Sequence, residues 1–168
     1  MMKKLAVFAV MIILSACGWT PVYSQGDNGI IKETEQIAIA PLDGKSGIIA
    51  REKLRDQLSP YGLTNNPKYS LTFSNMKVTY EKRGIRPDGT PTWGTVITVV
   101  DFKLTQLSDN KVLIEEKEYA FTSYNILDNV YSATVAEEQA AIRGAKMIAD
   151  QIATRIMAYF KDKSNEGL

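Results

Sequence analysis

The sequence predicts an α+β two-layer sandwich in which a four-stranded, mostly antiparallel sheet has two helices on one face. Apolar residues alternate in four stretches and recur every three to four positions in two others. These stretches follow one another in the order β-α-β-β-β-α, with no internal repeat. We therefore predict a single domain over residues 35–163 and a disordered tail at 164–168.

The first sixteen residues are typical of a lipoprotein signal peptide that is removed by cleavage. Lys3 and Lys4 precede an uninterrupted apolar run from Leu5 to Leu14, and small residues then lead to Cys17. A membrane-spanning helix needs about 20 apolar residues, and this run is much shorter. The segment is therefore predicted to direct export and not to anchor the mature chain by spanning the membrane.

Cys17 is the only cysteine, and it directly follows Leu14-Ser15-Ala16, an order that resembles a bacterial lipobox. The resemblance implies a diacylglycerol on the Cys17 sulfur and acylation of the new amino group. The alternative is a secreted protein with one free thiol, which would be reactive in an oxidising compartment. Each buried CH₂ contributes about 0.8 kcal/mol, so the acyl chains would keep the protein on its membrane. Gly18, by resemblance to lipoprotein sorting rules, favours the outer membrane.

Residues 17–34 are predicted to be the lipidated N-terminus and a flexible tether, because they are polar and show little periodicity. Trp19, Val22 and Tyr23 are the apolar exceptions in this segment. They are expected to contact the membrane interface or the surface of the domain, and docking into a partner is the alternative.

The domain begins with a short strand and a helix. Residues 35–41 alternate around Ile37 and Ile39, and Pro41 ends the strand. An amphipathic helix of about four turns is predicted from Ser46, which is expected to cap it, to Pro60. Its apolar stripe comprises Ile49, Leu54, Leu58 and Tyr61.

Three strands are predicted next. The apolar residues of 69–73 occupy odd positions and those of 76–80 occupy even positions, which predicts a β-bulge near residues 74 and 75. Residues 81–92 contain two glycines and two prolines and are predicted to form a long hairpin loop. In residues 93–107, apolar side chains occupy both odd and even positions, which predicts a central strand covered on both faces. The last strand is predicted over 112–121, with a phase change at 115–117.

A second helix is predicted over residues 132–161. Thr134 and Glu137 resemble a capping box at its start. Ala136, Ala140 and Gly144 form a smooth seam, which favours close packing on the sheet over a helix dimer. The predicted core stripe comprises Ala141, Ala145, Ile148, Ile152, Ile156 and Tyr159 or Phe160. If both helices cover one face of the sheet, the other face exposes aliphatic surface, and such surface usually marks a partner.

The composition argues against catalysis. The chain has no histidine and its one cysteine is predicted to be acylated, which excludes the usual zinc sites and the Ser-His and Cys-His nucleophile arrangements. Gly-rich phosphate loops are also absent from the sequence. We therefore predict no enzyme activity, no metal and no cofactor beyond the covalent lipid on Cys17. Loss of Lys3 and Lys4 leaves 18 basic against 19 acidic residues, so nucleic acid is not an expected partner.

Two charged features are candidate functional residues. Lys77, Lys82, Arg83 and Arg86 surround the single Glu81, and their local charge would suit phosphate groups. The alternative is a solvated hairpin tip, or an edge strand that its lysines protect from pairing. Asp101 lies in an apolar strand, where a pair with a lysine of a neighbouring strand is favoured over an acid with a raised pKa.

Several parts of the mature chain resemble the LptE family of lipopolysaccharide-assembly lipoproteins, particularly its alphaproteobacterial form. The matching residues are Cys17-Gly18-Trp19-Thr20-Pro21-Val22-Tyr23, Arg51 with Leu54 and Leu58, Tyr69-Ser70-Leu71-Thr72-Phe73, Ser123-Tyr124, Ala149-Asp150-Gln151-Ile152 and Arg155-Ile156. Trp19 departs from the pattern, which more often has Phe there.

The resemblance implies a non-enzymatic lipoprotein on the periplasmic face of the outer membrane. It would act as a plug and assembly subunit of the β-barrel translocon LptD and would assist lipopolysaccharide insertion into the outer leaflet. In that case the phosphates of lipid A are the ligand expected for Lys77, Lys82, Arg83 and Arg86. Two alternatives remain open: a lipoprotein subunit of another envelope complex, and a hydrolase anchored to the periplasmic face. No acidic pair in the sequence recommends the hydrolase.

Overall fold

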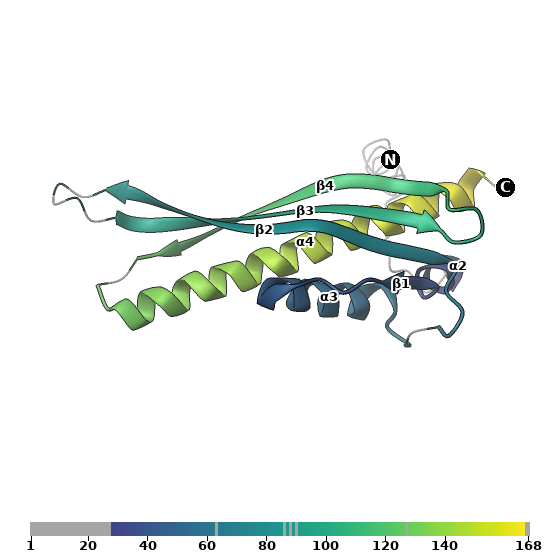
Figure 1. The fold of residues 1–168 in the computed structure, drawn as a ribbon, viewed down its shortest axis with the longest axis horizontal. Coiled ribbons are helices and arrows are strands. Elements are labelled where there is room, and N and C mark those ends of the chain that lie inside the picture. Colours follow the sequence, from purple (N-terminus) through teal and green to yellow (C-terminus); the bar gives the residue numbers. More distant parts are fainter. Residues whose placement is uncertain are drawn as a thin grey trace, which may run out of the picture.

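The computed structural model describes residues 28–166 except 63, 86, 88, 90 and 127. In this part of the chain the elements are α2 (Asn28–Thr34), β1 (Ile37–Ile39), α3 (Gly44–Leu58), β2 (Tyr69–Ile85), β3 (Pro91–Gln106), β4 (Val112–Asn125) and α4 (Val130–Glu166). A long twisted sheet lies over a layer of helices (Figure 1), which confirms the predicted α+β class. The helix α2 is an addition to the predicted order.

The sheet is mixed, with the strand order β1-β2-β3-β4. β1 pairs with β2 in parallel, whereas β2, β3 and β4 form an antiparallel meander. The predicted bulge in β2 is confirmed by a register shift between Ser74 and Lys77. The apolar phase changes across 115–117 as predicted, since Ile114 packs against the core and Tyr119 lies on the opposite face. No bulge accompanies it, because the β3–β4 register runs unbroken there and shifts instead between Leu104 and Thr105.

The hairpin loop predicted at 81–92 is wrong in its extent, because β2 continues to Ile85 and β3 begins at Pro91. Gly84 allows this pairing to continue. It has a φ of +68°, and a Cβ at this position would lie 2.4 Å from the Thr92 Oγ1. The Thr92 hydroxyl donates a hydrogen bond to the Gly84 carbonyl at 2.7 Å. A glycine therefore lets the strands remain paired at a site that the sequence suggested was a loop.

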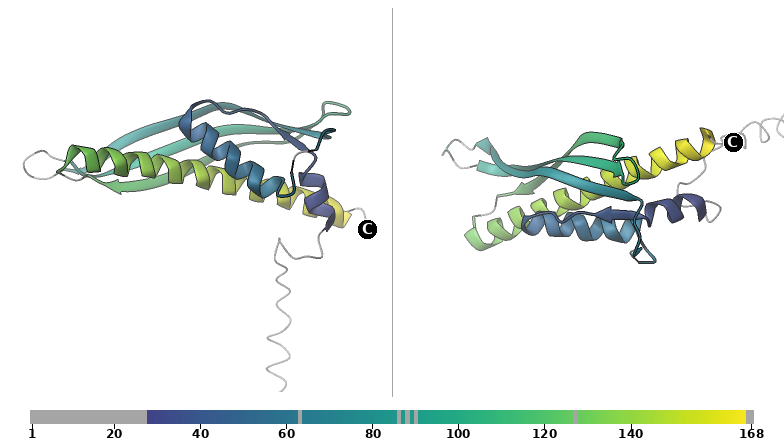
Figure 2. Two further views of the ribbon diagram at one scale, coloured as in Figure 1. Left: turned by 90° about the horizontal axis from the view of Figure 1, so that it is seen from below. Right: turned by 45° about the vertical axis from the view of Figure 1, so that its right-hand side comes forward.

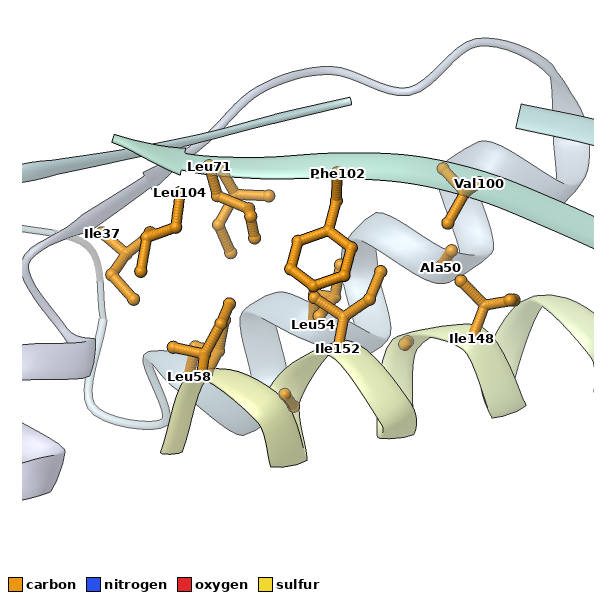
Figure 3. Close-up of a cluster of buried hydrophobic side chains, with 14 of the residues drawn as sticks. Ile37, Ala50, Leu54, Leu58, Leu71, Val100, Phe102, Leu104, Ile148 and Ile152 are labelled. Carbon is orange, nitrogen blue, oxygen red and sulfur yellow. The ribbon is translucent and has the colours of Figure 1, made fainter. Parts of the chain in front are cut away.

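The helices α3 and α4 lie on the same face of the sheet (Figure 2), as predicted. Figure 3 shows the core between the two layers. It includes the buried side chains of Ile37, Ala50, Leu54, Leu58, Leu71, Val100, Phe102, Leu104, Ile148 and Ile152. Fully burying one such aliphatic or aromatic side chain contributes about 1.5–3 kcal/mol. Tyr61, predicted to share the stripe of α3, is 84% exposed.

The two long helices begin differently from the prediction. Asp43, not Ser46, occupies the N-cap position of α3. α4 begins at Val130, where the side chain of Asn129 accepts a hydrogen bond from the Ser132 N–H at 3.1 Å. The capping box predicted at Thr134 is therefore wrong, because it lies one turn inside the helix. α4 continues to Glu166, so residues 164–166 of the expected tail are helical.

The seam of small residues on α4 packs on the sheet, as predicted. A Cβ added to Gly144 would lie 2.6 Å from the Thr98 Oγ1 of β3. The Thr122 hydroxyl of β4 donates a hydrogen bond to the Ala140 carbonyl at 2.8 Å. The small side chains thus bring the helix backbone within reach of the strand side chains, and the predicted core stripe of α4 is buried.

The helix α2 occupies residues that were expected to belong to the flexible tether. The Tyr69 hydroxyl donates a hydrogen bond to the Glu33 carboxylate at 2.9 Å, and the ring of Tyr69 packs edge-on against Phe160 of α4. Burial, and then the hydrogen bond to Glu33, raise the pKa of Tyr69 to about 12. α2 is therefore docked on the domain. In the described part of the chain, no helix combines the length and apolarity needed to cross a membrane.

Candidate functional site

The face of the sheet that points away from the helices is the candidate site. Alternation along β3 places its even-numbered residues from 94 to 104 against the helices, where they are buried. The odd-numbered residues of β3 lie on the opposite face, together with their cross-strand partners on β2 and β4. We call the apolar part of this surface the open-face patch. It comprises Trp93, Ile97, Val99, Tyr119 and Phe121.

Four residues of the open-face patch form a cross-strand cluster, and Trp93 lies further along the same face of β3. Ile97 pairs with Phe121, and Val99 pairs with Tyr119 in the next row. Phe121 is 61% exposed, Tyr119 47% and Trp93 39%, whereas Ile97 and Val99 are partly buried. Apolar surface on this face was predicted, but the prediction that β3 is covered on both faces is wrong. Aromatic side chains gain the most from burial at an interface, so this surface suits a partner.

Two ion pairs lie beside the patch, further along the same face. The Lys117 Nζ lies 3.1 Å from the Asp101 Oδ1, and the Lys103 Nζ lies 3.0 Å from the Glu115 Oε1. The predicted pair of Asp101 with a lysine of a neighbouring strand is therefore confirmed. The hydrogen bond to Asp101 raises the pKa of Lys117. Each pair joins β3 to β4, so this end of the face is polar and internally neutralised.

Hydrogen bonds join β4 to α4 behind the open-face patch. The Tyr124 hydroxyl donates a hydrogen bond to the Glu137 carboxylate at 2.8 Å. Burial, and then this hydrogen bond, raise the pKa of Tyr124 to about 12. The Arg143 guanidinium donates to the Ser123 carbonyl at 2.9 Å. The strand that presents Tyr119 and Phe121 is therefore held in place by the helix, which keeps the patch pre-organised.

The structure separates the predicted basic residues. Lys77 and Arg83 lie on the open face of β2, at either end of the patch, about 20 Å apart at 3.3 Å per residue. Lys82 pairs with Gly94 and points to the opposite face, and Arg83 donates a hydrogen bond to Glu81. Arg86 lies outside the described residues, as does Cys17 with its predicted lipid.

Sequence reasoning placed Tyr119, Phe121, Ile97 and Val99 in strands but did not unite them. The sequence signal that could have linked them is that all four occupy odd-numbered positions. Combining them required the β3–β4 register, which depends on a turn whose length the sequence left open. Trp93 was placed at the start of the predicted strand 93–107, but it was not linked to these residues.

These features define a class of protein: a small α+β sandwich with helices on one face and a pre-organised apolar surface on the other, suited to binding. Comparison with known proteins identifies the family. The LptE family, described as lipopolysaccharide-assembly, matches residues 34–156. An uncharacterised protein of Rickettsia prowazekii is 27% identical over 162 residues, which cover 95% of this chain and 98% of that protein.

Solved structures show the same fold. A Caulobacter crescentus chain described as a lipoprotein has a TM-score of 0.64 at 22% identity, covering 80% of this chain and 97% of that chain. A minor lipoprotein of Acinetobacter baumannii has a TM-score of 0.60 at 20% identity, covering 74% and 92%. The rare lipoprotein B of Shewanella oneidensis has a TM-score of 0.54 at 14% identity, covering 77% and 95%. The chain belongs to the LptE family of lipopolysaccharide-assembly lipoproteins, as the sequence resemblance predicted.

Proposed function

We propose that the protein is an outer-membrane lipoprotein, held at the periplasmic face by acyl chains on Cys17, that acts as a non-enzymatic plug and assembly subunit of an LptD-like β-barrel. In this role it assists the insertion of lipopolysaccharide into the outer leaflet. Membership of the LptE family supports a role in lipopolysaccharide assembly. The open-face patch supports the binding of a protein partner such as the β-barrel. An aromatic face exposed on an otherwise packed sandwich is best explained by a larger protein that covers it.

Co-purification with the barrel tests this proposal. The double variant Tyr119→Ser and Phe121→Ser removes the most exposed aromatics of the patch while leaving the helix-facing side chains of β4 unchanged. We expect detergent-extracted complexes of this variant to lose most of the barrel protein. Tyr61→Ser is the matched control, because Tyr61 is 84% exposed and lies outside the patch.

Full recovery of the barrel with the double variant would argue against the patch as the binding surface. A stable complex of the unaltered protein with a different envelope component, and none with the barrel, would favour the alternative role in another envelope complex. Turnover of an envelope substrate that disappears when one carboxylate is replaced would favour the anchored hydrolase.

We further propose that Lys77, Lys82, Arg83 and Arg86 contact the phosphates of lipopolysaccharide. Lys77 and Arg83 flank the open-face patch, an arrangement that suits a ligand with both apolar and phosphate groups. Replacing these four residues by serine should weaken lipopolysaccharide binding, and the loss should be largest at low salt. Lys146→Ser on the exposed side of α4 is the control. Unchanged affinity of the purified protein would exclude this contact.

A further inference from the structure

The outer edge of β4 is a surface that can pair with another strand. Among the described strands, β4 pairs only with β3. The Ile126 N–H, just past β4, donates to the Thr92 carbonyl, so the even-numbered residues of β4 point their backbone groups toward β3. The odd-numbered residues therefore point theirs away from the sheet. Arg143 of α4 agrees with this alternation, because its guanidinium donates to the outward carbonyl of Ser123.

The free part of the β4 edge extends from Lys117 to Phe121. Lys117, Tyr119 and Phe121 are exposed, and in the described part of the chain no hydrogen bond occupies their outward backbone groups. Edge strands commonly avoid pairing through charged side chains, proline or bulges. This stretch is in unbroken register with β3, and Asp101 neutralises Lys117. It is therefore a template for strand pairing.

A second copy of this chain fits the free edge when two β4 strands pair antiparallel about a two-fold axis at Tyr119. Tyr119 then lies opposite Tyr119 of the other copy, and Lys117 lies opposite Phe121. On the helix side of the sheet, Glu118 lies opposite Ala120. No like charges face each other in this stretch, and a lysine beside an aromatic ring is a favourable pair.

Neighbouring registers are less suitable. An axis at residue 118 would place Glu118 opposite its copy, and like charges directly opposite are destabilising. An axis at residue 120 would place Lys117 opposite Ser123, whose outward carbonyl already accepts a hydrogen bond from Arg143. The axis at Tyr119 uses only the free stretch of the edge.

The position of α4 allows two copies to meet in this way. A Cβ added to Gly144 would contact Thr98 of β3 and Thr122 of β4, so α4 lies beneath the space between these strands. Neighbouring strands are about 4.8 Å apart. Two β4 strands side by side would therefore place the two α4 axes about 10 Å apart. Packed helices are about 8–10 Å apart, so the two helices would be in contact.

The flank of α4 beside the β4 edge carries complementary features. Arg143 defines this flank, and Met147, four residues later, lies on the same side of the helix and is 41% exposed. Further along the flank is a groove of about 480 Å³. Its lining includes Gln151, Thr154 and Ala158 of α4 and Glu118 of β4. Because Glu118 adjoins Tyr119, the two-fold axis passes close to the groove, so Met147 of each copy can enter the groove of the other.

We propose that two copies of this protein form a symmetric dimer through their β4 edges. The backbones pair from Lys117 to Phe121, and Met147 of each copy packs in the α4 groove of the other. The two sheets then form one continuous sheet, with helices on one face and both open-face patches on the other. This inference does not rest on the barrel partner, because the pairing uses only the strand edge and the helix flank.

Cysteine cross-linking of the full-length protein, purified in detergent without the barrel, tests the pairing and its register. In a hydrogen-bonded antiparallel pair the Cα atoms are about 5.5 Å apart, a distance that a disulfide can bridge. Tyr119→Cys meets its own copy in this register and is expected to form a linked dimer with a mild oxidant. Phe121→Cys is the matched control, because its copy lies about 13 Å further along the strand. We expect it to cross-link at least about tenfold more slowly.

A proline substitution tests the backbone pairing. Lys117→Pro removes an outward N–H, whereas Lys117→Ser keeps it, and both variants lose the ion pair with Asp101. Pairing of β4 with β3 should persist, because proline is tolerated in an edge strand where the N–H faces solvent. We expect the dissociation constant of the dimer to be at least about tenfold higher for Lys117→Pro than for Lys117→Ser in analytical ultracentrifugation, since each copy loses a hydrogen bond. Matching urea unfolding of the two variants verifies that both are folded.

A charge on the flank of α4 tests the helix contact. Met147→Glu brings a carboxylate to a groove that already contains Glu118 and Asp150, and it should weaken the dimer at least about tenfold. Val135→Glu is the matched control. Val135 is 37% exposed on the same helix, but twelve residues away and therefore about 120° around the helix from Met147. The control should leave the dissociation constant unchanged.

Four results would overturn the proposal. The first is a monomer at every concentration of the unaltered protein in analytical ultracentrifugation. The second is equal cross-linking of Tyr119→Cys and Phe121→Cys, which would exclude this register. The third is equal dissociation of Lys117→Pro and Lys117→Ser, which would exclude strand pairing. The fourth is an unchanged dissociation constant in Met147→Glu, which would exclude the helix contact.

Discussion

Gly144 and Thr98 define how closely α4 approaches the sheet. A Cβ at position 144 would lie 2.6 Å from the Thr98 Oγ1, and that hydroxyl is buried without a hydrogen-bond partner among the described residues. Close packing at this point therefore depends on the absence of one side chain. Such tight contacts leave no room for an added methyl group without moving the helix or the strand.

Gly144→Ala is expected to destabilise the protein by about 1–3 kcal/mol, because the new methyl group must displace Thr98. In a Thr98→Ala background the same change should cost much less, because the clashing atom is gone. Chemical denaturation of the four proteins in this double-mutant cycle measures the coupling. Equal costs in both backgrounds would show that the helix responds to something other than Thr98.

For single residues, the sequence predicted the type of interaction better than the identity of the interacting residue. An aspartate in an apolar strand predicted an ion pair with a lysine, and Asp101 pairs with Lys117. The sequence could not name Lys117, because the choice depends on the β3–β4 register. The basic residues show the reverse case, since their proximity in the chain suggested one cluster and strand alternation separated Lys82 from its neighbours.

Among the elements, the bulge in β2 shows how a change in apolar parity is resolved. Ser74 faces Asp101 and Lys77 faces Val99, so Asn75 and Met76 together oppose Val100. The extra residue lets both halves of β2 place their apolar side chains toward the helices.

Deleting Asn75 should therefore preserve the register and cost only about 1 kcal/mol, because Met76 can take the single place opposite Val100. Deleting Thr72 removes a residue from a regular stretch and should cost several kcal/mol, since Leu71 or Phe73 must change face. Thermal unfolding of the two deletion variants makes the comparison. Similar losses from both deletions would show that the bulge does more than absorb a residue.

The predicted boundaries of helices and strands are wrong where tertiary contacts outweigh the local sequence pattern. α2 has seven residues, too few to show a helical period, and its hydrogen bond to Tyr69 comes from a residue 36 positions away. The strand ends at Ile85 and Pro91 were mispredicted for a different reason. Charged and Gly-rich sequence is tolerated in strands at the open end of a hairpin. The long periodic stretch of α4 was predicted correctly except at its ends.

For the whole molecule, two tyrosines connect distant parts of the fold and make its stability sensitive to alkaline pH. Tyr69 joins β2 to α2, and Tyr124 joins β4 to α4 near the start of that helix. The pKa of each is raised from 10.0 to about 12. The unfolded chain would lose these protons near pH 10, before the folded protein does.

The contribution of both tyrosines is therefore fully present below pH 10 and is lost as the pH rises through 12. We expect the free energy of unfolding to fall across this window, and we expect Tyr69→Phe with Tyr124→Phe to fall less steeply. Urea unfolding at several pH values measures the slope, with exposed Tyr61→Phe as the control. An unchanged slope in the double variant would assign alkaline sensitivity to other groups.

The length of α4 has a geometric consequence. A helix of 37 residues measures about 56 Å at 1.5 Å per residue, and β2 of 17 residues has a similar length at 3.3 Å per residue. α2 and the β2–β3 hairpin mark opposite extremities of this rod (Figure 1). The hydrocarbon layer of a bilayer is about 30 Å thick. A rigid body of this span, held upright inside a transmembrane ring, would project beyond both surfaces of the lipid, with the β2–β3 hairpin at one tip and α2 at the other.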